Sequence, residues 1–171
     1  IAKEHHGVIS VMPDEARGVA YVSTCTDARP VEHSQFMILD LAKKTGAFLS
    51  MDIFNTEYTQ SEGPKRGEME EFLRKDREVA QAQRDNFRKA VQMGIKLTMG
   101  TDTGVHPHQD APKQLAYMVQ YGMTPMQAIQ AATKVGAEAL GIDAEVGQIA
   151  PGYSADIVAV TRDPLTDIHA L

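Results

Sequence analysis

Short apolar runs alternate along this chain with longer stretches that have helical periodicity. The apolar runs occupy residues 7–12, a short segment ending at His33, residues 47–53 and residues 96–99. The helical patterns occupy residues 36–46, 70–94, 113–122 and 124–141. Strands that alternate with helices in this way form parallel sheets, because each return to the same edge needs a long crossover. The pattern therefore predicts an α/β fold built on parallel strands.

Composition narrows the classes of protein to consider. At 171 residues the chain is long enough for one domain with a hydrophobic core. It has 17 basic and 23 acidic residues and no basic run, which argues against a nucleic acid or an anionic membrane as a partner. No apolar run is long enough to span a bilayer. The single cysteine, Cys25, excludes an internal disulfide framework. Because the chain begins at Ile1 rather than Met, we expect that the native amino terminus is missing.

The stretch KLTMGTDTGVHPH, residues 96–108, places an acid just after a buried strand. In α/β folds, functional side chains gather at the carboxyl ends of parallel strands. Asp102 and His33 each follow an apolar run, and both are predicted to face one mouth of the sheet. Carboxylate and imidazole groups are ligands for zinc and similar divalent ions. The structural alternative is that Asp102 caps a helix or turns the loop.

Two polar segments carry predictions of their own. Residues 55–70 contain two glycines and a proline, and the part from 55 to 67 is predicted to be a mobile lid. The tail, residues 146–164, is punctuated by glycine and contains one short β run, DIVAV, at residues 156–160. We therefore divide the chain into a main domain, residues 1–143, and a small β appendage, residues 144–171.

Five motifs in the chain carry a family resemblance. They are VEHS, AFLSMD, GIKLTMGTDTG, TPMQAIQAATKVGAEALG and the pattern G-x-I-x-x-G-x-x-A-D-I-V from Gly147 to Val158. Together they resemble the carboxyl-terminal part of an amidohydrolase-superfamily metallohydrolase, in the imidazolonepropionase-like and Xaa-Pro dipeptidase-like (zinc carboxypeptidase) branch. The resemblance implies a (β/α)8 TIM barrel, of which residues 1–143 would supply about strands 5–8. Residues 144–171 would be the end of a small β-sandwich domain.

The resemblance also implies roles for particular residues. His33 corresponds to a strand-6 histidine that binds a metal ion, and Asp102 to the strand-8 aspartate. That aspartate is both a metal ligand and the proton shuttle for a metal-activated hydroxide. His108, with His106 as the neighbouring alternative, corresponds to a histidine that contacts the substrate carboxylate, and Tyr58 to a tyrosine that contacts the substrate carbonyl. Without the resemblance, both loop histidines would be solvated and Tyr58 would pack on the barrel rim.

The implied reaction is hydrolysis of an amide or peptide bond in a small substrate, with a binuclear divalent metal centre, zinc first. A cyclic-amide hydrolase of the imidazolonepropionase kind is the alternative. The family's metal ligands on strands 1, 4 and 5 have no counterparts here, and residues 12–28 depart from the family pattern. We therefore expect the chain alone to be inactive and the activity to belong to a longer protein. A half-barrel exposes strand edges and apolar faces, so we also expect a homo-oligomer or an assembly with another chain. A non-catalytic fragment that acts only in such an assembly is the second alternative.

Overall fold

Two parallel strands form the centre of the structure, a computed structural model whose described residues are 9–14, 19–24 and 39–171, with side chains from residue 39 onward. The strands are β3 (Phe48–Met51) and β4 (Lys96–Met99), and their register pairs Phe48 with Lys96 and Met51 with Met99. The two strands are parallel, and more than forty residues lie between them in the chain. This intervening segment is the crossover connection that the sequence pattern predicts. The central β-α-β unit is therefore as predicted.

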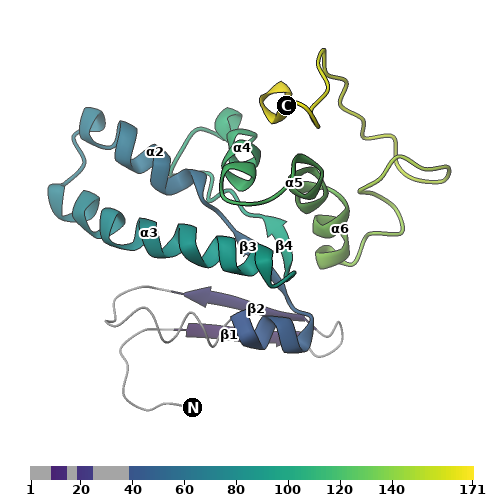
Figure 1. The fold of residues 1–171 in the computed structure, drawn as a ribbon, viewed down its shortest axis with the longest axis horizontal. Coiled ribbons are helices and arrows are strands. Elements are labelled where there is room, and N and C mark those ends of the chain that lie inside the picture. Colours follow the sequence, from purple (N-terminus) through teal and green to yellow (C-terminus); the bar gives the residue numbers. More distant parts are fainter. Residues whose placement is uncertain (1–8, 15–18, 25–38) are drawn as a thin grey trace.

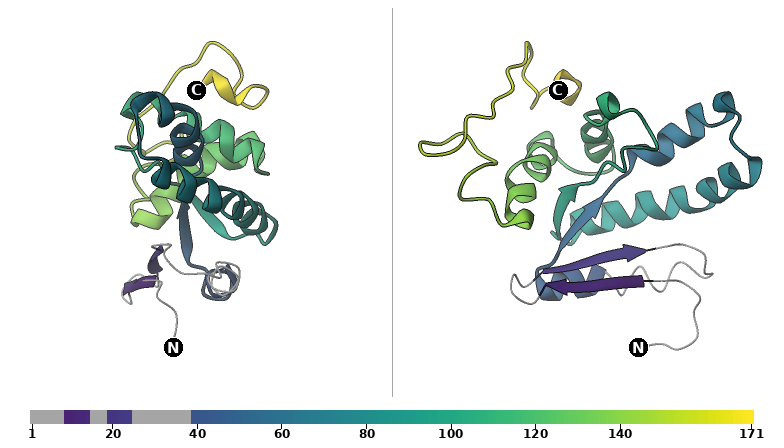
Figure 2. Two further views of the ribbon diagram at one scale, coloured as in Figure 1. Left: turned by 90° about the vertical axis from the view of Figure 1, so that its left-hand side faces the viewer. Right: turned by 180° about the vertical axis from the view of Figure 1, so that it is seen from behind.

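Helices cover both sides of this strand pair. Between the strands, the chain forms α2 (Phe54–Glu62), a 3-10 turn (Pro64–Arg66) and α3 (Glu70–Gln92). After β4 come a second 3-10 turn (His108–Asp110), α4 (Lys113–Gln120), α5 (Pro125–Ala132) and α6 (Lys134–Leu140). The pair α2–α3 lies on one side of the strands and α4–α6 on the other (Figures 1 and 2). Within the described part of the chain, we find no helix with the length and hydrophobicity that crossing a membrane requires.

The predicted helices with strong local signals are confirmed. The long charged helix stops at Gln92 and is followed by Gly94, whose φ of 63° suits glycine. Thr124 caps α5 in a reciprocal capping box with Gln127, and Pro125 stands at the first helical position. The predicted helix over residues 124–141 is two helices, because Thr133 leaves helical geometry between α5 and α6.

The first strand is present, but its pairing differs from the prediction. β1 (Ile9–Asp14) pairs with β2 (Val19–Thr24), and the two strands are antiparallel. Only four residues separate them, which suffices for a hairpin, whereas a parallel return needs a dozen residues or more. The described part of this apolar run, residues 9–12, therefore belongs to a two-stranded antiparallel sheet, and not to the β3–β4 sheet.

The predicted mobile lid is wrong in its secondary structure, because residues 54–62 form α2. The polar side chains of this helix find partners on neighbouring helices. The Glu57 carboxylate accepts hydrogen bonds from Arg84 Nε at 3.0 Å and from the Tyr121 hydroxyl at 2.8 Å. Burial raises the pKa of Tyr121, and the adjacent Glu57 carboxylate raises it further. Because α2 is stabilised by these pairs and by buried Thr56 and Thr59, it needs no apolar stripe of its own.

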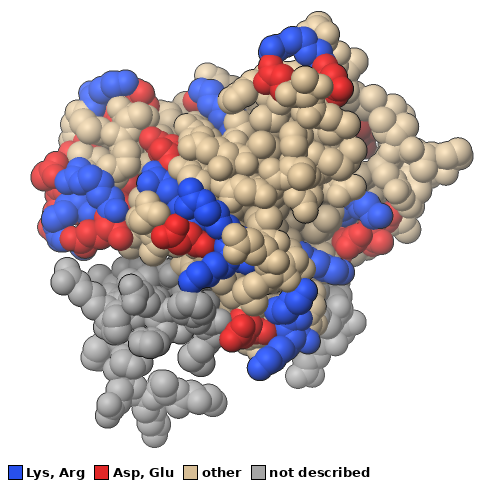
Figure 3. Space-filling view, in the orientation of Figure 1, with Lys and Arg blue, Asp and Glu red and all other residues tan. Residues whose placement is uncertain are grey.

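The helix α3 has one buried face and one charged face that is exposed to solvent. Leu73, Ala80, Phe87 and Ala90 are its buried residues. The opposite face carries ion pairs within the helix, such as Arg88 with Asp85 at 2.9 Å. Figure 3 shows charges of both signs gathered over α2 and α3, with far fewer over the middle of the molecule. Exposed pairs of this kind contribute little stability, so we assign this surface to solubility.

The tail does not form the predicted strand. Residues 156–160 have no regular secondary structure, and the Val158 side chain is 81% exposed. A β run becomes a strand only when a neighbouring strand accepts its hydrogen bonds, and the described residues offer none beside it. The chain ends in a short 3-10 turn (Ile168–Ala170), and its Ile168 packs into the core beside α4.

Candidate active site

Gly100 lies where the carboxyl ends of β3 and β4 meet. The Gly100 N–H donates to the Met51 carbonyl at 3.1 Å and extends the strand pairing by one residue. A Cβ placed at Gly100 would lie 3.0 Å from Ser50 Oγ and 3.2 Å from the Asp52 nitrogen. Any side chain at this position would push the strand ends apart, so the glycine in the GTD motif has a steric role.

Two acids meet at this edge. Asp52 follows β3 directly, and Asp102 stands three residues after β4. Burial raises the pKa of the Asp52 carboxyl, and repulsion from the nearby Asp102 carboxylate raises it further, while a hydrogen bond with Asn55 lowers it. The Asn55 amide Nδ2 also donates to Asp102 Oδ2 at 3.3 Å. Asp52, Asn55 and Asp102 thus form one polar cluster, which we call the strand-end cluster.

The backbone of Asp102 adopts the left-handed conformation, with φ of 47°. Asp is among the few non-glycine residues that adopt this conformation readily. The Asp102 carbonyl accepts the Val105 N–H at 3.2 Å, and no helix begins at the residues that follow it directly. Asp102 is therefore not a helix N-cap here. Its side chain is exposed and projects from a tight turn.

His106 and Tyr58 lie together beside the strand-end cluster. The His106 side chain is only 2% exposed, and its Nε2 and Nδ1 lie 2.7 Å from the Thr101 carbonyl and 3.0 Å from the Pro107 carbonyl. The His106 ring is 4.7 Å from the Phe54 ring and 6.0 Å from the Tyr58 ring, measured between centroids. A neutral imidazole has one N–H, so it can donate to only one of the two carbonyls. In this conformation the His106 side chain stabilises the loop to which it belongs, through its contacts with the Thr101 and Pro107 carbonyls.

The remaining predicted residues are placed differently. His108 begins the second 3-10 turn and is exposed. Tyr58 is half-buried, and the guanidinium carbon of Arg66 lies 5.7 Å from its ring centroid. Arg66 also donates from Nη1 to the Val105 carbonyl at 3.2 Å, which ties α2's end to the Asp102 loop. His33 lies outside the described residues, so its shared site with Asp102 stays a prediction.

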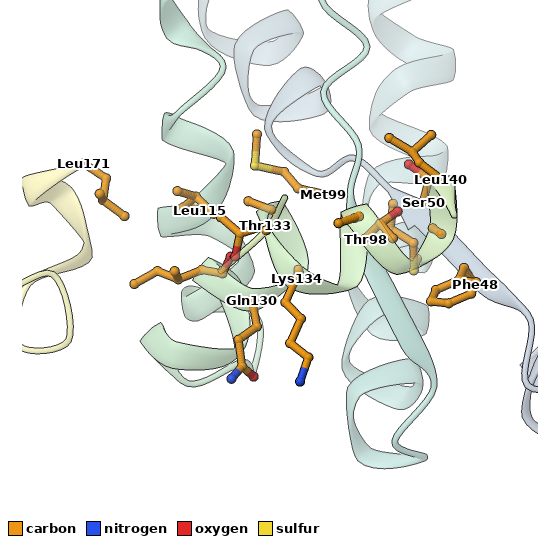
Figure 4. Close-up of a pocket in the computed structure, with 18 of the residues that line it drawn as sticks. Phe48, Ser50, Thr98, Met99, Leu115, Gln130, Thr133, Lys134, Leu140 and Leu171 are labelled. Atoms are coloured by element: carbon orange, nitrogen blue, oxygen red, sulfur yellow. The ribbon is translucent and has the colours of Figure 1, made fainter. Parts of the chain in front are cut away.

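An open cavity of about 1870 Å³ adjoins the strand-end cluster, and Asp52, Asn55 and Asp102 form part of its wall. Figure 4 shows part of its wall, where Ser50 and Thr98 come from the strands, Thr133 from between α5 and α6, and Leu140 from the end of α6. The cavity lies against the face of the β3–β4 sheet, so the acids stand at the rim of a space large enough for a small molecule.

The Gln114 side chain stabilises the turn after β3, and nothing in the sequence indicated this role. Its side chain is fully buried, and its Oε1 accepts the backbone N–H groups of Ile53 and Phe54 at 3.0 and 2.8 Å. Its Nε2 donates to the Met51 carbonyl at 3.1 Å. These N–H groups open α2, which lacks a side-chain cap from its own N-cap residue. Gln114 on α4 therefore caps α2 across the fold and fixes the turn that carries Asp52 and Asn55.

The oxygen donors of the strand-end cluster suit a divalent metal ion in chemical type. Within the described ranges, however, no group of three or more His, Cys, Asp or Glu side chains could hold such an ion. The described residues therefore fit as one side of a metal site, with Asp102 as the exposed carboxylate. A metal site here would take its further ligands from residues outside these ranges.

Comparison with known proteins places this geometry in a family. The chain matches the amidohydrolase family over residues 15–171, which includes most of the segment 12–28 that seemed to depart from the family pattern. It is 28% identical over 166 residues to the ochratoxinase of Aspergillus niger, which covers 95% of this chain and 32% of that protein. It is 42% identical over 86 residues to adenine deaminase 4 of Rhizobium meliloti, which covers 44% of this chain and 14% of that protein.

A solved structure agrees. The fold superposes on a Xaa-Pro dipeptidase with methionine bound in its active site, with a TM-score of 0.72 and 34% identity. This match covers 81% of the present chain and 35% of that chain, so the present chain spans about a third of the length of this dipeptidase and of the ochratoxinase. The family match extends over nearly all of the residues, the strand-end cluster included. The chain belongs to the amidohydrolase family.

Proposed function

We propose that the full-length protein is a metal-dependent hydrolase of amide or peptide bonds, of the dipeptidase or carboxypeptidase kind. One observation carries the proposal. Asp102 presents an exposed carboxylate at the carboxyl end of β4, on the rim of a cavity and beside the end of a second parallel strand. That is where parallel α/β folds place their chemistry. The likeness to an ochratoxinase and to a Xaa-Pro dipeptidase supports the choice of reaction class.

Asp102 has two roles in this proposal. A bound divalent metal, zinc by preference, would polarise the scissile carbonyl and make water a better nucleophile at neutral pH. Asp102 is one ligand, and it accepts the proton that the attacking water loses as its oxygen bonds to the carbonyl carbon. Asp102 then gives this proton to the amine nitrogen as the carbon–nitrogen bond breaks. The products are a carboxylate and a free amine, and Asp102 returns to its starting state.

Substrate recognition in the proposal comes from the loop after β4 and from α2. His108 is exposed on the Asp102 loop and is the better candidate for binding the substrate carboxylate. His106 is buried with both ring nitrogens near backbone carbonyls, so it would first have to leave these contacts. Tyr58, which packs beside His106, is the proposed partner of the substrate carbonyl. His33 is the proposed second ligand position.

Assembly completes the proposed active unit. In the described residues, β3 and β4 pair only with each other, so each strand has one unpaired edge. We infer that these edges pair with further strands, from the rest of a longer protein or from a second copy of this chain, since unpaired strand edges seldom remain open.

Product analysis with the full-length protein tests the reaction class. The substrates are dipeptides with carboxyl-terminal Pro, Arg or hydrophobic residues, N-acyl amino acids, a cyclic amide and an aminopurine. We expect release of a free amino acid from at least one substrate of the first two classes. Opening of the cyclic amide alone would favour the imidazolonepropionase-like alternative. Release of ammonia from the aminopurine alone would contradict the proposed reaction.

A further inference from the structure

The Asn55 side chain connects the ends of both parallel strands. Asn55 is the second residue of α2, and its Nδ2 donates to Asp102 Oδ2 at 3.3 Å. The Asp52 carboxyl is the other acid near this amide, which lowers the pKa of that carboxyl. Its Oδ1 accepts the Thr56 N–H at 2.7 Å. Because a backbone N–H can only donate, it fixes which end of the amide is oxygen, and it directs the Nδ2 group toward the acids.

This contact makes the two oxygens of Asp102 different. Oδ2 accepts the Asn55 N–H, whereas no side chain or backbone group of the described residues donates to Oδ1. A hydrogen bond to one oxygen restricts the rotation of a carboxylate, and it leaves the other oxygen of Asp102 without a donor. The Asp102 backbone is itself in a tight left-handed turn, so both the main chain and the side chain of this residue are held.

The contact is not needed to build α2. Gln114 already caps the first N–H groups of this helix, and the Glu57–Arg84 ion pair holds its middle against α3. Asn55 is only partly buried, and its amide nitrogen donates to Asp102 rather than to the helix backbone. An amide at this position therefore serves the strand-end cluster more than the stability of the fold.

We propose that Asn55 is a positioning residue for Asp102: it holds Oδ2 and leaves Oδ1 as the oxygen that serves the reaction. The inference rests on the proposed function, since it assigns Asn55 to the same proton transfer. Loss of the donor frees Asp102 to rotate.

The test compares Asn55→Ala and Asn55→Ser in the full-length protein with a matched control, Gln81→Ala. Gln81 also donates an amide N–H to a carboxylate, Asp85 at 3.0 Å, but on the exposed face of α3. Two quantities are measured: kcat and KM on the best amide substrate, and the Zn²⁺ dissociation constant by competition with a chelating dye. Residues that orient a metal ligand typically contribute about 10–100-fold to metal affinity or activity.

We expect Asn55→Ala to lower kcat about 10–100-fold with KM nearly unchanged, and to weaken Zn²⁺ binding by about the same factor. Asn55→Ser, which keeps a donor, should recover part of both losses, and Gln81→Ala should match the parent. Parental kcat and Zn²⁺ affinity in Asn55→Ala would overturn the inference and leave the proposed function intact. A change in KM alone would also overturn it. If the unmodified protein hydrolyses no amide, the proposed function fails, and the Zn²⁺ affinities alone then decide the role of Asn55.

Discussion

Asp102→Asn in the full-length protein should lower kcat for amide hydrolysis by at least about 10²–10⁴-fold, the usual contribution of a general base. Asn is nearly isosteric with Asp and adopts the left-handed conformation at least as readily, so the turn at φ of 47° should persist. It has no negative charge, binds a metal ion more weakly and cannot take up the proton of the attacking water. The measurement is steady-state kinetics together with a thermal melt.

The matched control for this prediction is Asp110→Asn. Asp110 lies on the same loop and pairs with Lys113 at 2.7 Å, away from the strand-end cluster. It should keep the parental kcat. An inactive Asp102→Asn protein with a parental melting temperature supports the catalytic role. A purely structural role for Asp102 in the turn predicts the opposite, since Asn replaces Asp in turns without loss. Near-parental kcat in Asp102→Asn would therefore remove Asp102 from the mechanism.

Gln114→Leu should be the most destabilising single change, at roughly 3 kcal/mol or more. The substitution leaves the buried N–H groups of Ile53 and Phe54 without their partner, and each unsatisfied group costs about 1–3 kcal/mol. The Met51 carbonyl loses one donor and keeps the Gly100 N–H. Leu is similar in volume, so loss of packing is a small part of the effect. The measurement is the urea midpoint of the full-length protein.

Gln120→Leu is the control for Gln114, because Gln120 lies on the same helix and is exposed. A surface change of this kind should shift the free energy of unfolding by no more than about 0.5 kcal/mol. If Gln114→Leu unfolds at the same urea concentration as the control, then the trans cap on α2 is not a significant source of stability.

The elements that the sequence predicts well are those with local signals. The apolar runs of β3 and β4, the glycine after α3 and the Thr124–Pro125 start of α5 each act within a few residues. The helix α2 has no such signal. Its stability comes from Arg84 and Tyr121, far away in the sequence, and from Gln114 at its first turn. From sequence alone, a polar segment of this kind is predicted to be a loop, because the residues that stabilise it lie on other helices.

For the tail and the first strand, the sequence gives a clear β signal but does not show whether a neighbouring strand is available. DIVAV has strong β propensity, yet a strand also needs a neighbour, and none lies beside it among the described residues. The run at residues 7–12 has the apolar character of a parallel strand, but β2 begins only four residues after β1 ends, and the two strands make a hairpin. In both cases local propensity predicts β structure and the available partner determines the outcome.

The candidate site could be predicted only in part. Asp102 was found because it follows a buried strand, and the same argument applies to Asp52 in the motif SMD, which was overlooked. Asn55 was beyond sequence reasoning, since its role depends on the start of α2 lying across the end of β4. The family resemblance implies His108 as the substrate contact and His106 as the neighbouring alternative, and it gives no sign that His106 is buried against Phe54.

The central claim is that this site hydrolyses amide bonds with a divalent metal, and metal removal tests it most directly. The full-length protein is freed of metal with a chelator, its metal content is measured, and release of amino acid from the best substrate is followed before and after Zn²⁺ is restored. We expect the metal-free protein to lose hydrolysis and the restored protein to regain it, with no recovery in Asp102→Asn. Undiminished hydrolysis by protein verified as metal-free would contradict the claim.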